Sequence, residues 1–202
     1  MTNRCKWMSA ALSIAIVTAG SAFAADGVAF GEKPSFQAGA QLDYGVSDDK
    51  KAFTIMFGDL EVAVESGKLP EKVAKRVRST ATTGPVVTRV CAIVIPLKGS
   101  KSIKTSFYFQ GYVSTSPGAQ GILFIRVNGE NKVVKFGPKL DRSFLEKVNF
   151  SSTSASEIRM TVFLLAERDG QHQNASAYLN VSTIDTDASV AKKRANTKSA
   201  SR

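Results

Sequence analysis

Residues 122–136 read Ile-Leu-Phe-Ile-Arg-Val-Asn-Gly-Glu-Asn-Lys-Val-Val-Lys-Phe, and this stretch decides the fold class. Two apolar-rich runs, residues 122–127 and 131–136, flank the pair Asn128-Gly129. Asn-Gly suits the positive φ angles of a two-residue type I′ turn better than most dipeptides do. The stretch therefore predicts an antiparallel β-hairpin, and it favours a β fold for the chain on either side of it.

Alternating apolar and polar residues predict further strands before and after this hairpin. Phe107 and Phe109, for example, fall on one face of a run in which Tyr108 and Gln110 fall on the other. The expected strands cover residues 52–57, 59–65, 86–96, 103–115, 158–166 and 175–184. Several short strands separated by frequent turn residues are typical of an all-β fold, an antiparallel β-sandwich or jelly roll.

Two of these segments carry a more specific expectation. Residues 86–96 are apolar on both faces apart from Thr88 and Arg89, which predicts a central strand that is covered on two sides. Gly58-Asp59 separates the first two strands and permits a bend or bulge there.

Turn and helix signals complete the expected architecture. Asp169-Gly170 lies between the last two strands and predicts a second hairpin. Helical periodicity is confined to residues 71–78 and 142–148, and each stretch is too short to be a major element.

The amino-terminal residues predict export. Arg4 and Lys6 precede an uncharged apolar run over 8–19, and Ser21-Ala22-Phe23-Ala24 supplies a small-x-small cleavage site. We expect a signal peptide over residues 1–24 and a mature protein in the periplasm or outside the cell. The apolar run is shorter than the roughly 20 residues of a membrane span, so no transmembrane segment is expected.

The remaining chain divides by composition into three parts. Residues 25–40 are small and polar with scattered apolar positions, and we expect an arm there. Residues 41–185 should form the β-sandwich domain. Residues 186–202 lack aromatic side chains and are rich in lysine and arginine, which predicts a disordered cationic tail.

The formal net charge of +10 is unevenly distributed. Positive charges gather in the leader, in the tail and in a basic segment that contains Lys72, Lys75, Arg76 and Arg78. No aromatic residue is interleaved with these cations, which argues against stacking on nucleic-acid bases. The segment and the tail are candidate contacts for a polyanion, and a merely solvated basic stretch is the alternative.

Cysteine and histidine usage limits the chemistry. Cys5 lies in the leader, so Cys91 has no internal disulfide partner, and its apolar strand predicts a buried thiol. The single histidine, His172, lies in the expected loop after Asp169. A Ser–His–Asp triad, a histidine-based metal centre and a bound cofactor are therefore not expected.

Carboxylates offer the only other catalytic candidates. Glycoside hydrolysis needs two acids several ångströms apart. Asp48 and Asp49 lie in an expected loop, whereas Asp59, Glu61 and Glu65 fall on the polar face of an expected strand. Acids in such places are typical of solvated surfaces, so no catalytic residue is assigned.

Tyr108, Gln110 and Tyr112 form the candidate binding row. Alternation places them on one strand face about 7 Å apart per step, together with Lys104 and Ser106. Such a row suits stacking on a glycan or on a partner's strand. The alternative is that the two tyrosines pack beneath a loop or the second sheet with wet hydroxyl groups.

Three short motifs resemble a family of small secreted proteins, the domain-of-unknown-function family numbered 4360. They are Ser-Asp-Asp at 47–49 with Phe-Thr-Ile-Met-Phe-Gly-Asp-Leu at 53–60, Arg-Val-Cys-Ala-Ile at 89–93, and Tyr-Phe-Gln-Gly-Tyr at 108–112. Gln110 stands where the family has arginine, and the family's other cysteines are missing, which excludes any disulfide that the resemblance would imply. The resemblance covers residues 43–137, and it implies a secreted β-sandwich without a catalytic residue.

We therefore expect an exported, non-enzymatic binding or envelope-associated module. Its partner would be an anionic glycan, an envelope component or another protein, with oligomeric state left open. The alternatives are a secreted carbohydrate-active enzyme that uses Asp59, Glu61 or Asp48, and a structural or adhesive subunit whose long strands pair with those of its neighbours.

Overall fold

The computed structural model describes residues 29–32, 34–37, 40–65, 71–75, 84–99, 102–172 and 174–189. The expected signal peptide lies outside these residues, and so do residues 190–202 of the expected tail.

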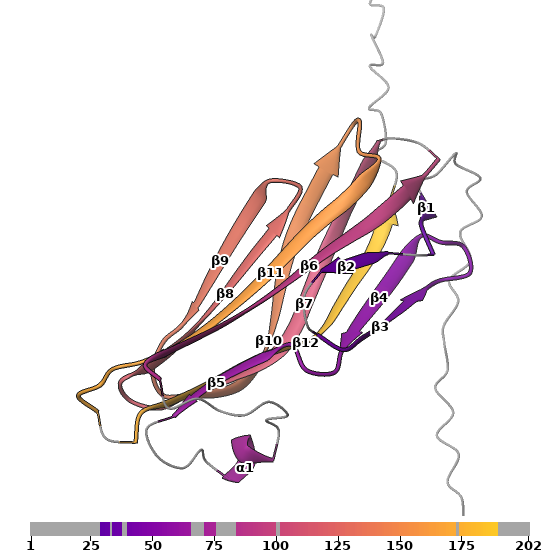
Figure 1. The fold of residues 1–202 in the computed structure, drawn as a ribbon. Helices are drawn as coiled ribbons and strands as arrows, with labels where there is room; N and C mark the ends of the chain where they lie inside the picture. Colours follow the sequence, from indigo (N-terminus) through magenta and orange to yellow (C-terminus); the bar gives the residue numbers. More distant parts are fainter. Residues whose placement is uncertain are drawn as a thin grey trace, which may run out of the picture.

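Two antiparallel sheets stack face to face, which confirms the expected all-β sandwich (Figure 1). The first, named here the β11 sheet, contains β1 (Ala29–Phe30), β2 (Ser35–Gln37), β6 (Val86–Lys98), β8 (Ala119–Val127), β9 (Glu130–Phe136) and β11 (Glu157–Arg168). The second, the β12 sheet, contains β3 (Leu42–Val46), β4 (Ala52–Phe57), β5 (Glu61–Glu65), β7 (Ile103–Thr115), β10 (Leu140–Ser152) and β12 (Ser176–Ser189). A single short helix, α1 (Glu71–Ala74), is present in the described part of the chain.

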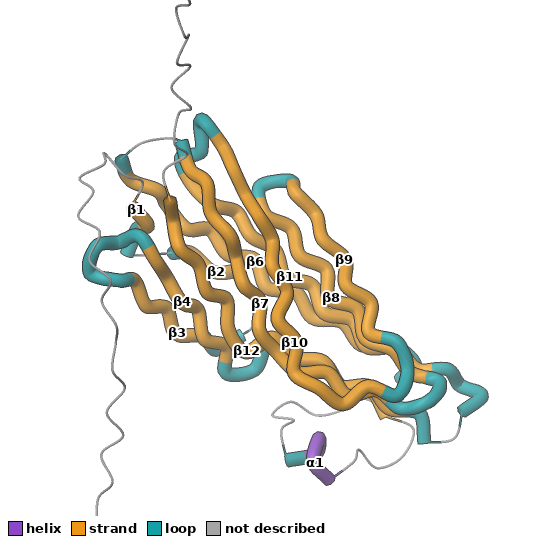
Figure 2. Tube along the Cα trace, turned by 180° about the vertical axis from the view of Figure 1, so that it is seen from behind, coloured by secondary structure: helices purple, strands orange, loops and turns teal. Residues whose placement is uncertain are grey.

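The strand order is that of a jelly roll. The β11 sheet runs β1-β6-β11-β8-β9, with β2 also on β6, and the β12 sheet runs β10-β7-β12-β4-β3, with β5 also on β12 (Figure 2). From β6 onward successive strands change sheet, except for β8 and β9. Those two form the hairpin that the sequence predicts, with Asn128 and Gly129 at φ 46° and 99°. Both angles are positive, as a type I′ turn requires.

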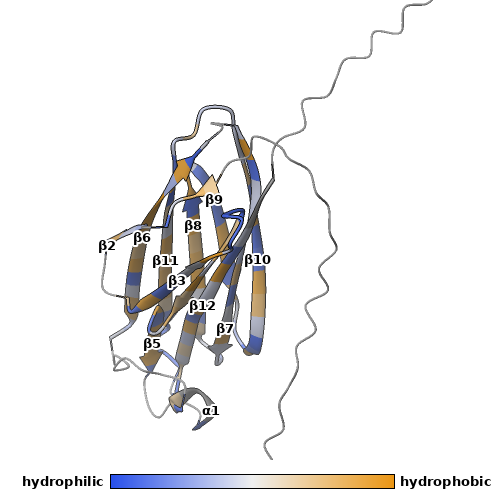
Figure 3. Ribbon diagram, turned by 90° about the vertical axis from the view of Figure 1, so that its right-hand side faces the viewer, coloured by the Kyte–Doolittle hydropathy of each residue, from blue (hydrophilic) through white to orange (hydrophobic). Residues whose placement is uncertain are grey.

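The core lies between the sheets and is built from alternate residues of each strand. Figure 3 shows hydrophobic and hydrophilic residues alternating along the strands. Phe107, Phe109 and Val113 of β7 are fully buried and face Leu123 and Ile125 in the same hydrophobic core. Each fully buried side chain of this size contributes about 1.5–3 kcal/mol, so the domain depends on its apolar core for stability.

The expected arm, residues 25–40, contributes two short strands. β1 and β2 both pair with the edge of β6. Phe30 of β1 is fully buried, and its ring meets that of Phe53 edge-on with centroids 4.8 Å apart. At the other end, β12 continues to Ser189, past the expected end of the domain at residue 185.

The predicted second hairpin is wrong. β11 and β12 are consecutive in the chain, but they belong to different sheets. The residues between them, 169–175, are numerous enough to cross the roughly 10 Å that separates stacked sheets. Asp169-Gly170 therefore belongs to an arch, a loop that connects a strand of one sheet to a strand of the other. Turn residues such as Asp and Gly occur in arches as well as in hairpins.

The predicted helical stretch at 142–148 is also wrong, because β10 covers it as a strand. All thirteen residues of β10 pair in register with β7. Phe144, Val148 and Phe150 are buried on one face, and a strand period continues through them. The other helical stretch, at 71–78, contains α1 at its start.

The strand over 86–96 is covered on only one side. Cys91, Ile93 and Ile95 face the core, whereas Val86 and Val90 are 48% and 41% exposed. A sandwich has two layers, so even a strand inside a sheet has one outward face. The prediction of a doubly covered strand is therefore corrected.

A bend at Gly58 divides one long strand into β4 and β5. Both halves pair with β12, on either side of a bulge between Val181 and Thr183. The Gly58 N–H donates to the Gln41 carbonyl at 2.7 Å. The bend expected at this position is confirmed.

Lys132 of β9 reaches the outer edge strand of the other sheet. Its ammonium lies 2.8 Å from the Glu146 carboxylate and donates to the Lys147 carbonyl of β10 at 2.9 Å. The two sheets are thus tied together at the edge where β9 and β10 end the layers.

No helix among the described residues has both the length and the apolar character needed to cross a membrane.

Candidate functional site

The expected row on β7 exists, but only two of its three members are accessible. Tyr108 is half-buried and Gln110 is exposed on the outer face of the β12 sheet. Tyr112 lies on the same face but is only 7% exposed, with its ring centroid 6.2 Å from that of Tyr178 on β12. Tyr112 is therefore packed, as the alternative expected, but beside a tyrosine of its own sheet and with a buried hydroxyl group, so its ring is not an exposed stacking platform.

Tyr108 borders a hollow of about 560 Å³ between β7 and β10. The hollow is lined by Lys104, Thr105, Ser106, Tyr108, Lys147, Asn149, Phe150 and Ser151. The register explains this set, because Lys147 pairs with Tyr108, Asn149 with Ser106 and Ser151 with Lys104. Paired residues on neighbouring strands point to the same face of a sheet, so two short rows of polar side chains meet around one aromatic ring.

Two cations line the hollow together with the aromatic ring. The Lys147 ammonium lies 5.6 Å from the Tyr108 ring centroid, in the range of a cation–π contact. Lys104 is exposed two positions before Ser106 on the same face. Ser106 donates a hydrogen bond to Asn149 at 2.9 Å, which fixes the polar floor between the lysines.

On the opposite side of Tyr108, Asp185 of β12 organises a different group of side chains. Its carboxylate accepts hydrogen bonds from Gln110 at 2.9 Å, Thr54 at 2.6 Å and Thr183 at 3.3 Å. Gln110 is thus held by the protein itself and stands outside the lining of the hollow. On the outer face of this sheet Tyr108 thus lies between Lys147 of β10 and Asp185 of β12.

The residues of β10 that complete the hollow are absent from the sequence-based candidates. Lys147 falls in the stretch over 142–148 that the sequence predicts to be helical, and a helix does not place alternate residues on one face. Phe144, Val148 and Phe150 are spaced by even numbers of residues, and this two-residue period, which continues past the end of that stretch, indicates a strand.

Only Lys75 of the basic segment has a described side chain, and it does not line the hollow. Lys75 is exposed and forms an ion pair with Glu71 at 2.7 Å. Arg76, Arg78 and the side chain of Lys72 lie outside the described residues. In Figure 1 α1 lies below β5, whereas the hollow is lined by residues from the start of β7 and from β10.

The candidate carboxylates have structural partners. Asp59 lies 2.8 Å from the Arg89 guanidinium and accepts the Gln41 N–H at 2.6 Å. Glu61 is only 4% exposed and accepts a hydrogen bond from the Tyr178 hydroxyl at 2.9 Å. The prediction of a solvated polar face is wrong for Glu61, because Tyr178 from a strand 117 positions later covers it.

Asp49 in the β3–β4 turn stabilises that turn through hydrogen bonds. Asp49 accepts hydrogen bonds from the Ser47 hydroxyl at 2.6 Å and from the Lys51 N–H at 3.1 Å. These bonds, the Ser47 bond first, lower the pKa of Asp49. Asp48 is exposed beside it. Among the described residues, no three histidine, cysteine or acidic side chains gather as a metal site would require.

His172 and Cys91 lie where the sequence predicts. His172 is exposed in the arch between β11 and β12, where its Nδ1 lies 3.0 Å from the Asp169 carboxylate. Cys91 is a free cysteine with no exposed surface, and burial raises the pKa of its thiol to about 11.

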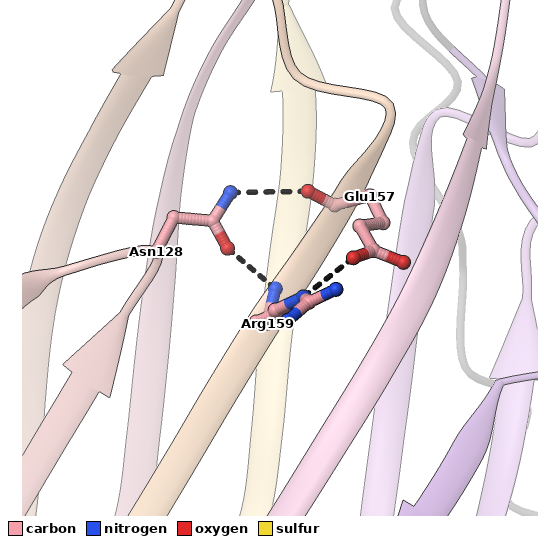
Figure 4. Close-up of polar contacts among 3 residues, drawn as sticks. All are labelled: Asn128, Glu157 and Arg159. Atoms are coloured by element: carbon pink, nitrogen blue, oxygen red, sulfur yellow. Dashed lines mark hydrogen bonds and ion pairs between the residues drawn. The ribbon is translucent and has the colours of Figure 1, made fainter.

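A second hollow, of about 590 Å³, lies at one end of the β11 sheet and contains Arg126 and Arg159. Figure 4 shows its polar contacts. The Asn128 amide donates to the Glu157 carbonyl at 3.0 Å and accepts the Arg159 N–H at 2.5 Å, while Arg159 Nε lies 2.5 Å from Glu157. No aromatic side chain lines this hollow, in contrast to the one beside Tyr108.

Comparison with known proteins finds matches among solved structures only. No protein-family model matches the chain, and no curated protein matches it. A solved structure of TmCBM61 in complex with β-1,4-galactotriose aligns at 9% identity and a TM-score of 0.28. The alignment covers 73% of this chain and 88% of that one. A likeness at this level does not bear on what the present chain binds.

Proposed function

We propose that this protein is an exported, non-enzymatic binding module that holds an anionic glycan in the hollow beside Tyr108. The observation that carries the proposal is the meeting of Lys104, Lys147 and Tyr108 around one hollow on an outward sheet face. Its volume of about 560 Å³ falls within the range of ligand sites, about 300–1,000 Å³.

Each part of the hollow matches one part of an acidic sugar. The Tyr108 ring offers an apolar surface for the C–H groups of a pyranose once the Lys147 ammonium that lies over it turns to the ligand's carboxylate or sulfate, which Lys104 also attracts. Asn149, Ser151 and Ser106 supply donors and acceptors for sugar hydroxyl groups. Because the site lies on a sheet face, a polymer can extend beyond it in either direction.

Export rests on the leader at residues 1–24, whose charged start, apolar run and cleavage site are described above. The engagement of Asp59 by Arg89 and of Glu61 by Tyr178 supports a binding role over hydrolysis. The basic segment is not part of the proposed site.

Isothermal titration of the protein with an acidic and a neutral polysaccharide of similar length tests this proposal. We expect binding to the acidic polymer that weakens as salt rises, because screening shortens the reach of the lysine charges. Lys147→Ala should lower the affinity about tenfold, equivalent to about 1.4 kcal/mol, and Lys147→Arg should retain most of it.

Lys98→Ala is the matched control, since Lys98 is an exposed lysine at the end of β6 in the other sheet. An equal loss of affinity in Lys98→Ala and Lys147→Ala would show that net charge alone attracts the polymer. Equal affinity for the neutral polysaccharide would refute an anionic ligand.

A further inference from the structure

The outward face of the β11 sheet carries a continuous apolar row. Phe163 of β11 pairs in register with Val90 of β6 on one side and Phe124 of β8 on the other. Phe124 in turn pairs with Val133 of β9. Val90 and Val133 are 41% and 54% exposed, and both phenylalanines are half-buried.

The row is widened by a second one. Leu165 and Ile122 pair with each other one step along the strands, flanked by Thr88 and Lys135. In Figure 1 this sheet faces the viewer, and no described strand or helix lies in front of it. Monomeric proteins seldom leave a contiguous apolar surface of this kind open to water.

Charges of opposite sign end the apolar zone along β11. Glu167 lies four residues after Phe163, and Arg159 lies four residues before it. All three residues share the outward face, because the side-chain period of a strand is two. Arg159 is 75% exposed in its side chain and forms an ion pair with Glu157 on the same face at 2.5 Å, and Glu167 accepts a hydrogen bond from Gln120.

We propose that two copies of this chain pack through this face, with a two-fold axis that lies in the interface over Phe163 and runs perpendicular to β11. Such an axis, perpendicular to the strand, places Phe163 on Phe163 of the second copy. It also places Glu167 opposite Arg159 of the second copy, and the symmetry repeats that contact. The charge pattern on β11 is thus complementary to itself, which is what an isologous interface needs.

The size of the face fits a stable dimer. The paired lengths of β6, β11, β8 and β9 are 11, 11, 9 and 7 residues, which at about 3.3 Å per residue and about 4.8 Å between strands give an area of roughly 600 Å². Standard interfaces bury about 800 Å² on each partner, and the side chains of the rim supply the remainder. Sheets that stack face to face interdigitate their side chains about 10 Å apart, which suits rows of valine and phenylalanine.

The proposal is independent of what the hollow beside Tyr108 binds, because that hollow lies on the opposite outer face. Sedimentation equilibrium of the full chain from 1 to 500 μM tests it. We expect a mass twice that of one chain at the upper concentrations. Val133→Asp, on an exposed position of edge strand β9, should raise the dissociation constant at least tenfold while the far-ultraviolet circular dichroism stays unchanged.

Charge reversal identifies the arrangement. Arg159→Glu and Glu167→Arg should each weaken the dimer about tenfold, and the double variant should restore most of the loss. Leu145→Asp is the matched control, since Leu145 is 61% exposed on the outer face of the β12 sheet. It should leave the mass unchanged.

Three results would overturn the proposal. A single-chain mass up to 500 μM means that another molecule covers this face or that it stays open. A dimer that persists in Val133→Asp uses a different surface. Charge reversals that fail to compensate each other exclude the two-fold axis at Phe163.

Discussion

The two outer faces of the sandwich stand on strands of similar length and differ in the side chains at the centre of each face. The β12 sheet presents Lys104, Tyr108 and Lys147 to solvent, and Asp185 beyond them. The β11 sheet presents a row of valine and phenylalanine around Phe163. The inward residues of both sheets are alike and form one core.

This contrast shows that alternate residues of one strand have separate roles, one set in the core and the other on the outer face. Every second residue is committed to the core, and the residues between are free to differ without a change of fold. A polar outer face stays open to small or flexible ligands. An apolar outer face favours a partner with a rigid surface, because only close packing over a large area removes the apolar side chains from water.

The sharpest test compares a phenylalanine of the core with one of the apolar outer face. Phe107→Ala removes a fully buried ring and should cost about 3–5 kcal/mol of unfolding free energy. Phe163→Ala, in dilute protein, should cost below about 2 kcal/mol because the ring is half-buried. Urea unfolding at 1 μM measures both. Equal losses would mean that another part of the chain covers Phe163, and the contrast between the faces would fail.

Thiols at two consecutive positions of β6 test the difference between an inward and an outward residue of one strand. Cys91 faces the core with a pKa of about 11, whereas Val90 beside it is 41% exposed. In a Cys5→Ser background at pH 8, a thiol introduced by Val90→Cys should react with a disulfide reagent at least about a hundredfold faster than Cys91. Two pKa units alone reduce the thiolate fraction by that factor.

The raised pKa of Cys91 also fixes the sign of a pH effect. The folded state holds the neutral thiol, so this stabilisation is complete below the ordinary thiol pKa of 9.0 and is lost as pH rises toward 11. Cys91→Ala should reduce this alkaline loss. Rapid labelling of Cys91 in the native protein at pH 8 would contradict its burial.

Exchanging aromatic residues on the two faces should affect two different measurements. Tyr108→Leu removes the ring from the hollow and should weaken glycan binding about tenfold, equivalent to about 1.4 kcal/mol, without changing the mass in solution. Phe124→Leu lies in the apolar row and should weaken self-association while leaving glycan binding intact. Titration calorimetry and sedimentation separate the two effects. Coupling between them would show that the faces do not act independently.

The smallest expected effect concerns the hydrogen bonds that cross the polar face. Asp185→Asn replaces one carboxylate oxygen by an NH2 group, which cannot accept the hydrogen bond that the Gln110 amide donates. Loss of this hydrogen bond should lower the free energy of unfolding by about 1 kcal/mol. Thr183→Val removes the longest of the three bonds to Asp185 and is a milder control. Thermal unfolding with matched buffers measures the difference. A stability equal to that of the unaltered protein would show that water replaces these bonds without loss.

Local patterns in the sequence predicted the elements well where one strand and its turn suffice. Asn128-Gly129 specified the β8–β9 hairpin, and alternation placed Tyr108 and Phe107 on opposite faces of β7. These features depend on backbone angles and on a period of two, both of which are properties of a short segment.

Features that depend on distant strands were not predictable in this way. Tyr112 and Glu61 both follow the polar phase of an alternating run, yet Tyr178 packs beside the first and donates to the second. The arch that contains Asp169 has the turn residues of a hairpin. Only the position of β12 in the other sheet shows that β11 and β12 do not form a hairpin. The hollow needed β10 beside β7, a pairing that no local signal specifies.

Lys132 has a consequence for behaviour at high concentration. β10 is a thirteen-residue strand at the border of its sheet, the kind of template on which filaments grow by adding one chain after another. An incoming strand would have to displace the Lys132 ammonium from the Lys147 carbonyl and from Glu146. We therefore expect this lysine to hinder strand addition at the β10 edge, and Lys132→Val is the change that would remove the hindrance.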